Sequence, residues 1–227
     1  MDMLTGWQNP CGKLAETIPL NYTDTPAANY FPGKKQNVEY REGLYIGYRY
    51  YETACKEVRY PFGYGLSYTT FEYSDLKVNE DSATFTITNT GDRDGAEIAQ
   101  LYIAKPGAKI FRPERELKGF SKVFLKAGES QTVTISLDDK AYRYWNVQTN
   151  QWEVEGGIYQ IQIGASVQDI RLMGLLNVKG TNAPDPYEGK KLACYRTATI
   201  KSVPDDEFET LLGHPVSEEK TVIDRTM

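Results

Sequence analysis

The sequence predicts a mostly β protein whose central part folds as a β-sandwich of roughly seven strands. Three segments carry this prediction by alternating apolar residues with threonine, serine or glutamine: "ATFTITN" (83–89), "TVTISLD" (132–138) and "IYQIQIG" (158–164). Period-two patterning of this kind is typical of antiparallel strands with one buried face. Short strands separated by turn signals, with no helical pattern between them, favour a sandwich over a parallel sheet.

Further strands complete the sandwich between about residues 66 and 178. The additional segments are "AEIAQLYIA" (96–104), "ELKGFSKVFL" (116–125) and "YRYWNV" (142–147). Glycine-, asparagine- and aspartate-rich stretches mark the turns, and the paired aspartates at 92 and 94 and at 138 and 139 are interpreted as turn formers. The charged stretch "RPERELKGF" (112–120) indicates an edge strand with cross-strand ion pairs, and partner binding by Arg112 or Arg115 is the alternative.

The segments on either side of the sandwich have a different character. Residues 1–59 begin with a helical turn stopped by Gly6, and we expect Gly43 and Gly47 to prevent a helix over 40–52. This segment alone would not bury a core. Beyond residue 178 we expect an extended strap, then one short helix at about 203–212, capped by Ser202 and stopped by Gly213. Such a short helix must dock its apolar stripe on the sandwich or on a partner.

Composition excludes several classes of function. The 227 residues include 26 basic and 31 acidic side chains, a net charge of −5, which argues against a nucleic-acid partner. No apolar run approaches the ~18 residues of a membrane span. The three cysteines, Cys11, Cys55 and Cys194, are too far apart for a disulfide framework or metal knuckle, which favours a reducing, cytoplasmic location.

The residues contain no recognisable catalytic constellation. The single histidine, His214, follows the predicted helix stop and is interpreted as a surface residue. No cluster of ligands predicts a metal, and no glycine-rich loop predicts a nucleotide cofactor. Glycosidic chemistry requires two carboxyl groups roughly 5–10 Å apart in a cleft. Glu39 and Glu42 are the only pair near an aromatic run, and solvated loop residues are the competing interpretation.

Six ordered motifs, spanning about residues 3–176, resemble the C-terminal part of a family 3 glycoside hydrolase of the bacterial β-glucosidase type. They are "NPCGKLAETIP", "VEYREGLYIGYRYYE", "YPFGYGLSYTTFEYSDL", "NTGDRDGAEIAQLYI", "RPERELKGFSKVFLKAGES" and "WEVEGGIYQIQIGAS". In that family a barrel domain carries the aspartate nucleophile, and an α/β-sandwich domain carries the acid/base glutamate in many members. A fibronectin type III-like domain, which has an immunoglobulin-like sandwich, follows them.

The resemblance implies a division of the chain into three parts. Residues 1–59 would be the C-terminal remnant of the α/β-sandwich domain, and residues 60–178 the fibronectin type III-like sandwich, with 60–68 as the junction. Residues 179–227 would form the tail with its short helix. The nucleophile and acid/base motifs are absent and Glu39 and Glu42 match neither, so no catalytic residue is assigned. The resemblance thus implies a C-terminal fragment, or one piece of a split enzyme, whose native start lies upstream of Met1. An extracellular location stays open for that reason.

The resemblance also predicts a role for "YPFGYGLSYTTFEY" (60–73), in which aromatic residues are interspersed with Pro61 and two glycines. We expect a domain seam filled by Tyr60, Phe62, Tyr64, Tyr68 and Phe71. The alternative is that these side chains are only the core of the first sandwich strand. Candidate substrate-facing residues come from "GLYIGYRYY" (43–51), namely Tyr45, Tyr48 and Arg49.

Two hypotheses for function follow. In the first, the chain braces upstream catalytic domains of a β-glucosidase that uses a retaining two-carboxylate mechanism, and walls the entrance to its active site. The parent enzyme would contact carbohydrate, and the remnant 1–59 would favour self-association of the isolated chain. In the second, the chain is a free-standing carbohydrate-binding or adhesive module that uses Trp145 and Trp152. A simple cross-strand pair in a hairpin is the competing interpretation of these tryptophans.

Overall fold

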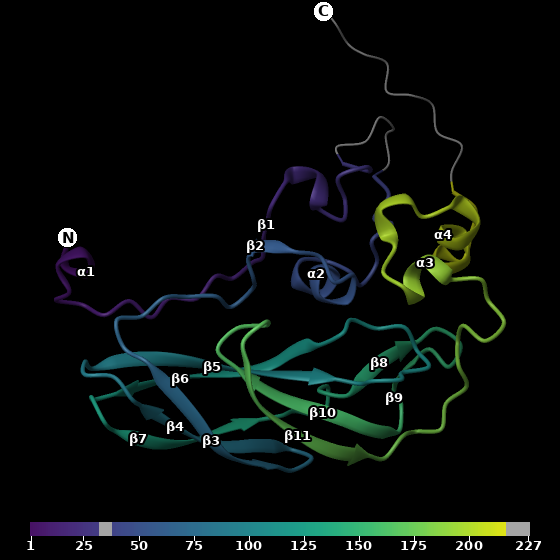
Figure 1. Cartoon of the computed structure of the whole chain (residues 1–227). Helices are drawn as coiled ribbons and strands as arrows, with labels where there is room; N and C mark the ends of the chain where they lie inside the picture. Colours follow the sequence, from purple (N-terminus) through teal and green to yellow (C-terminus); the bar gives the residue numbers. More distant parts are fainter. Residues whose placement is uncertain (32–37, 217–227) are drawn as a thin grey trace, which may run out of the picture.

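The computed structural model describes residues 1–31 and 38–216, and its largest part is a β-sandwich (Figure 1). A four-stranded sheet in the order β11-β10-β5-β6 packs on a three-stranded sheet in the order β3-β4-β7. Every strand pair is antiparallel, which confirms the predicted seven-stranded sandwich. The strands are β3 (Phe71–Val78), β4 (Ser82–Asn89), β5 (Gly95–Ala104), β6 (Glu116–Leu125), β7 (Ser130–Ser136), β10 (Gly157–Gly164) and β11 (Ile170–Val178).

The alternating residues of the sequence form the core between the two sheets. Phe85 and Ile87 of β4 and Ile161 and Ile163 of β10 are fully buried, while the threonines of β4 face outward and are only partly covered. Phe85 also stacks on Tyr73 of β3, with ring centroids 6.1 Å apart. The period-two pattern therefore determines which face of each strand is buried.

The segment predicted as a strand at 142–147 forms a separate hairpin. Strand β8 (Arg143–Asn146) pairs only with β9 (Gln151–Val154), with Trp145 directly opposite Trp152. The charged stretch 112–120 does lie at a sheet edge, as predicted, but none of its ion pairs within the described residues joins two strands. Glu116 pairs with Lys118 on its own strand and with Arg49 of a neighbouring helix, and Arg112 pairs with Glu155, which lies between β9 and β10.

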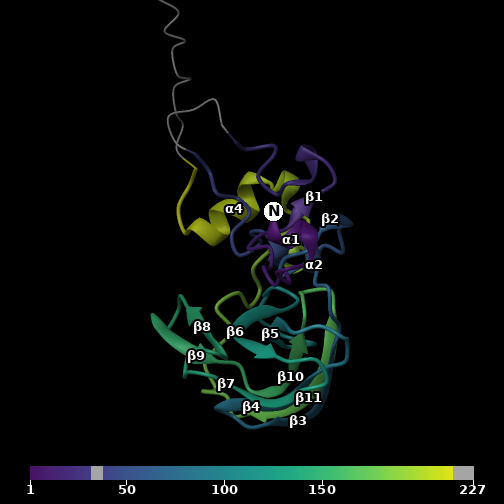
Figure 2. The ribbon, with the colours of Figure 1, turned by 90° about the vertical axis from the view of Figure 1, so that its left-hand side faces the viewer.

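A second, smaller unit lies against one side of the sandwich (Figures 1 and 2). We call it the flanking module: residues 18–31, 38–60 and 187–216. It contains β1 (Ile18–Pro19), η1 (Tyr22–Asp24), α2 (Tyr48–Thr53), β2 (Val58–Tyr60), α3 (Ala193–Arg196), η2 (Ile200–Ser202) and α4 (Asp205–Leu212), while α1 (Asp2–Thr5) lies apart from it. Its apolar cluster joins the two ends of the chain and also takes in Phe111 from the loop before β6: Tyr45, Tyr50, Tyr51, Phe111, Leu192, Tyr195, Ala198, Ile200, Val203 and Phe208.

Two sequence-based expectations for this module are wrong. A helix does form in the second half of this run, at Tyr48–Thr53, because Gly47 is the residue before α2 rather than a residue inside it. Its φ of +56° turns the chain at that point at little cost for a glycine. The C-terminal helix α4 forms where predicted and ends at the left-handed Gly213, but Pro204 rather than Ser202 precedes it, without a side-chain cap.

The C-terminal segment also docks differently from the expected strap. Its apolar residues pack on residues 45–58 of the flanking module and not on the sandwich sheets. Phe208 of α4 and Tyr195 of α3 are buried in that contact, whereas Leu212 remains exposed. The N-terminal segment therefore does bury a core, but only with the tail as its partner. Residues 217–227 of the predicted tail lie outside the described residues.

Arg41 connects the two halves of the flanking module. Its guanidinium pairs with Asp205 and Glu39, each at 2.6 Å, and donates to the carbonyl oxygen of Val203 at 2.8 Å. It also lies over the ring of Phe208, 4.8 Å from the centroid. The side chain of Arg41 is buried, whereas that of Asp205 is largely exposed. The packing of Arg41 and its bond to Val203 should therefore contribute more to the stability of the flanking module than its ion pair with Asp205.

Replacing Arg41 with methionine is expected to lower the stability of the flanking module by about 1–2 kcal/mol, since a buried hydrogen bond is lost while the apolar stem is kept. Urea unfolding followed by hydrogen exchange measures this change. Arg171→Met removes an exposed pair with Asp169 and serves as the control, with an expected change below about 0.5 kcal/mol. Equal effects of the two substitutions would contradict the bridging role of Arg41.

Candidate functional site

The contact between the flanking module and the sandwich is made by one side of helix α2. The backbone N–H of Leu117 donates to Tyr48 Oη, that of Glu114 donates to Thr53 Oγ1, and Gln168 Nε2 donates to Glu52 Oε1, each at 2.8 Å. Burial raises the pKa of the Glu52 carboxyl above its ordinary value, although Gln168 and Arg115 oppose the shift. Tyr48 and Glu52, four residues apart, project from the same side of the helix, and Thr53 adds a bond at its last residue, so this short helix is held in a defined orientation.

The segment after β2 adds a second set of contacts. The ring of Phe62 lies 4.7 Å from that of Tyr48, which in turn meets the edge of Tyr102 in β5 at 6.2 Å. Gln100 Nε2 donates to the carbonyl oxygen of Gly63 at 3.2 Å. Gly63 has a φ of +79°, and a Cβ there would lie 2.1 Å from Gln100 Oε1, so the approach requires glycine. Sequence reasoning missed Gln100 and Tyr102, whose only signal was their position on the outer face of a strand.

The five residues expected in a seam have different surroundings. Phe71 lies in the sandwich core, as the alternative interpretation predicts for it, and Phe62 lies between the two units. Tyr60 and Tyr68 are 41% and 46% exposed. Tyr64 is half-buried, with its ring 5.3 Å from that of Tyr60.

The three candidate substrate-facing residues also differ. Tyr45 is only 1% exposed, and its hydroxyl donates to the carbonyl oxygen of Tyr195. Tyr48 is half-buried in the contact with Phe62. Arg49 alone has a side chain substantially open to solvent, 3.8 Å from Glu116. In this arrangement Arg49 is the one member of the three that is free to face a ligand.

Burial raises the pKa of Tyr45 to about 12, and it also raises the pKa of Tyr50 and Tyr51 in the same cluster. An unfolded tyrosine ionises near pH ~10. Since the folded pKa is the higher one, the protonated side chains favour folding below pH 10, and this contribution is lost as the pH rises toward 12.

We therefore expect the flanking module to unfold in alkali between about pH 10 and 12. The absorbance of tyrosinate measures the ionisation of the tyrosines, and circular dichroism recorded on the same sample measures unfolding. Tyr45→Phe should shift the transition to higher pH. Complete ionisation of all tyrosines near pH 10 without a change in circular dichroism would contradict the assignment.

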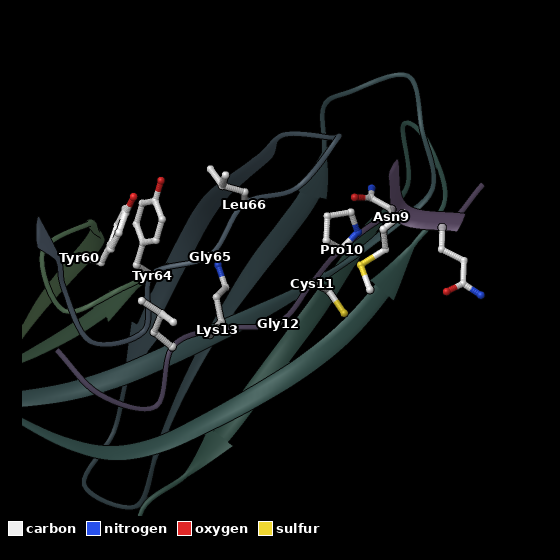
Figure 3. A pocket seen from close by; sticks show the side chains of 12 residues that line it. Asn9, Pro10, Cys11, Gly12, Lys13, Tyr60, Tyr64, Gly65 and Leu66 are labelled. Atoms are coloured by element: carbon white, nitrogen blue, oxygen red, sulfur yellow. The ribbon is translucent and has the colours of Figure 1, made fainter. Parts of the chain in front are cut away.

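A largely apolar hollow of about 740 Å³ opens where residues 8–14 run beside residues 60–66 (Figure 3). Two backbone bonds join the segments: Leu14 N–H donates to Tyr64 O, and Gly63 N–H donates to Leu14 O, both at 2.8 Å. Lys13 is the only charged residue among those that line the hollow, and its ammonium is neutralised by Glu97 at 2.9 Å. The hollow thus offers an apolar surface and no carboxylate.

Exposed apolar side chains continue around this hollow. We call this region the junction surface: Met3, Tyr60, Tyr64, Leu66 and Tyr68. Leu66 is 70% exposed and Met3 is 55% exposed. Of the 23 large apolar side chains that are exposed in the described residues, 14 precede residue 69, including Leu4, Trp7, Leu20, Tyr22, Phe31, Tyr40 and Ile46. Apolar side chains that gather around one hollow, as those of the junction surface do, are typical of an interaction surface.

The remaining chemical candidates do not form a reactive group. Glu39 is engaged by Arg41, and Glu42 is 6% exposed within the flanking module. His214 is exposed beside Pro215. Among residues 1–31 and 38–216, no group of three potential ligands could hold a metal ion. Within the same two ranges, no helix has both the length and the apolar composition to cross a membrane.

Comparisons with known proteins agree with this architecture. A family model described as "Fibronectin type III-like domain" matches residues 97–167. The exo-α-(1→6)-L-arabinopyranosidase of Bifidobacterium longum is 49% identical over 174 residues, which cover 74% of this chain and 23% of that protein. Thermostable β-glucosidase B of Acetivibrio thermocellus is 46% identical over 188 residues, which cover 79% of this chain and 25% of that protein. The chain thus spans about a quarter of the length of the curated relatives it matches.

Solved structures give the same result. The GH3 β-glucosidase of Bifidobacterium adolescentis aligns with a TM-score of 0.77 and 41% identity, covering 88% of this chain and 31% of that one. β-Glucosidase 3B of Thermotoga neapolitana, solved with glucose, aligns with a TM-score of 0.74 and 45% identity over 78% of this chain and 26% of that one. The chain therefore carries a fibronectin type III-like domain, and its sequence and fold are those of the C-terminal region of the family 3 β-glucosidases.

Proposed function

We propose that this chain is the non-catalytic bracing part of a larger β-glycosidase of the β-glucosidase type. The parent enzyme would hydrolyse terminal β-D-glucosyl bonds with two carboxyl groups supplied by preceding domains. The observation that carries the proposal is the junction surface, an apolar region that is exposed in a chain spanning about a quarter of its relatives' length. Burial of such a surface against another domain stabilises the assembly by roughly 25 cal/mol per Å² of apolar area.

Bracing requires that the surface be presented in one orientation. The bonds of Tyr48, Glu52 and Thr53 to the sandwich support this requirement, because they tie α2 to a large and independently packed core. The sandwich would then act as a rigid support for the catalytic domains. We also assign Arg49 to the wall of the active-site entrance of the parent enzyme, because the side chain of Arg49 is partly open to solvent.

A chimera tests the proposal. In the β-glucosidase of Bifidobacterium adolescentis, the region that aligns with this chain is replaced by this chain. We expect a chimera that hydrolyses 4-nitrophenyl β-glucoside, whereas the same enzyme without the region should be inactive and the isolated chain should show no turnover. Hydrolysis by the isolated chain, or an inactive chimera that is correctly folded, would overturn the proposal.

Single substitutions sharpen the test. Leu66→Asp places a charge on the junction surface and should leave the isolated chain stable to within about 0.5 kcal/mol, because Leu66 is 70% exposed there. In the chimera the same change should abolish activity or assembly. Leu175→Asp, at a 63% exposed position of β11, is the matched control and should be tolerated in both proteins.

The same surface gives an expectation for the isolated chain. Without its partner domains, the junction surface is free to associate with a second copy. Sedimentation velocity should then show a concentration-dependent dimer that Leu66→Asp weakens. A strictly monomeric chain at high concentration would exclude self-association through this surface.

A further inference from the structure

A second hollow, of about 810 Å³, lies between the β8–β9 hairpin and the flanking module. The hairpin contributes Trp145 and Trp152, the loop before β6 contributes Phe111 and Arg112, and the C-terminal segment contributes Tyr187 and Leu211. Figure 2 shows the hairpin at the side of the sandwich, below α4. We call this hollow the hairpin groove. Its volume lies within the roughly 300–1,000 Å³ of typical small-molecule sites.

The groove has an aromatic wall that remains open to solvent. Trp145 and Trp152 face each other across the hairpin with ring centroids 5.4 Å apart in an edge-to-face arrangement. Such a pair stabilises a hairpin by itself, yet the two rings are still 44% and 59% exposed and line the groove. Exposed tryptophan rings beside a hollow provide flat apolar faces, on which the CH faces of sugar rings can pack.

The groove also contains cationic groups, and not all of them are neutralised. Arg143 pairs with Asp139 at 2.7 Å, and Arg112 pairs with Glu155 at 3.5 Å. Lys140 has no ion pair within the described part of the chain, and the buried Nε of Arg112 has no hydrogen-bond partner there. Lys118 pairs with Glu116, which also lines the groove, at 3.5 Å. The exposed ammonium of Lys140 is therefore the cationic group open to a ligand, and the largely buried Arg112 lies in the groove wall, although the whole chain has a net charge of −5.

We propose that the hairpin groove binds an acidic oligosaccharide, meaning a glycan with a uronic acid residue. Its sugar rings would pack on Trp152 and Trp145, and its carboxylate would face the exposed ammonium of Lys140. This assigns the sandwich a ligand site of its own, beyond bracing, and it does not depend on the proposed function. Because the groove is lined by both units, the site also requires the docked C-terminal segment.

Tryptophan fluorescence and calorimetry on the full chain test the proposal. The probe is xylotriose that carries one glucuronic acid, and neutral xylotetraose is the matched neutral sugar. We expect saturable binding of the acidic probe and a preference of about tenfold over the neutral sugar, equal to roughly 1.4 kcal/mol. Higher salt should reduce this preference, because Lys140 is screened at the surface.

Variants locate the site. Lys140→Gln, which leaves the hairpin intact, should remove the preference for the acidic probe. Trp152→Ala should lower the binding affinity for the acidic and the neutral sugar about tenfold each. Trp7→Ala removes an 86% exposed tryptophan outside the groove and should have no effect. Circular dichroism checks that each variant is folded, and Trp152→Phe replaces Trp152→Ala if the latter unfolds.

Three results would overturn the proposal. The first is no binding of the acidic probe to the full chain at several millimolar. The second is equal affinity for the acidic and the neutral sugar. The third is binding that Trp7→Ala abolishes while Lys140→Gln leaves it unchanged.

Discussion

A chain shortened to end at Pro186 is expected to lose the fold of residues 41–58 while its seven-stranded sandwich stays folded. The shortened chain lacks α3, η2 and α4, and with them the buried partners of the N-terminal segment: Leu192, Tyr195, Ile200, Val203 and Phe208. Each fully buried side chain of this size contributes about 1.5–3 kcal/mol. The gross loss is therefore comparable to the ~5–15 kcal/mol that stabilises a whole domain.

The sandwich should survive because its core is separate. Its cluster contains residues from all seven strands and ends with Val178, before the deleted segment. We expect two populations of amide protons by hydrogen exchange. Those of α2 should exchange rapidly in the shortened chain, and those of β4 and β10 should keep their protection.

A chain ending at Val216 is the matched control, since it keeps every residue of the flanking cluster. Its α2 amides should be protected as in the full chain. Protection of α2 that persists after truncation at Pro186 would show that the N-terminal segment folds alone. That result would contradict the role we assign to the C-terminal segment.

Replacing Asn89 with alanine is expected to destabilise the sandwich by about 3–4 kcal/mol, since each buried polar group left unpaired costs ~1–3 kcal/mol. Asn89 ends β4 and is fully buried. Its Oδ1 accepts from Thr69 Oγ1 at 2.6 Å and from the N–H of Gly91 at 3.1 Å. Its Nδ2 donates to the carbonyl oxygens of Arg93 at 2.7 Å and Leu125 at 3.1 Å.

These bonds join the end of β6 in one sheet to the turn after β4 in the other. Alanine leaves several buried donors and acceptors without partners, and the connection from β4 to β5, which joins the two sheets, loses its anchor. Chemical denaturation monitored by far-ultraviolet circular dichroism gives the free energy of unfolding. Asn177→Ala, at an exposed position of β11, should change it by less than about 0.5 kcal/mol. Equal effects of the two substitutions would contradict this account.

The candidate site was predicted less well than the fold, and particular residues show why. Tyr45 and Tyr48 lie in one aromatic run, but the first is in the flanking core and the second contacts the sandwich. Aromatic content marks both kinds of environment equally, so the sequence could not separate them. Gln100 and Tyr102 had no special signal, since their contacts come from a segment some forty residues earlier in the chain.

The sequence by itself determined the sandwich and the end of the last helix. Alternation along β4, β7 and β10 specifies which side of each strand is apolar, and a glycine in the left-handed conformation ends α4. Only the tertiary structure decided that the two ends of the chain share a core through Arg41, Tyr195 and Phe208. Local periodicity encodes which face of a helix or strand must be buried, but not which segment covers that face. The covering segment is selected by the match in shape and charge between parts of the chain about 150 residues apart.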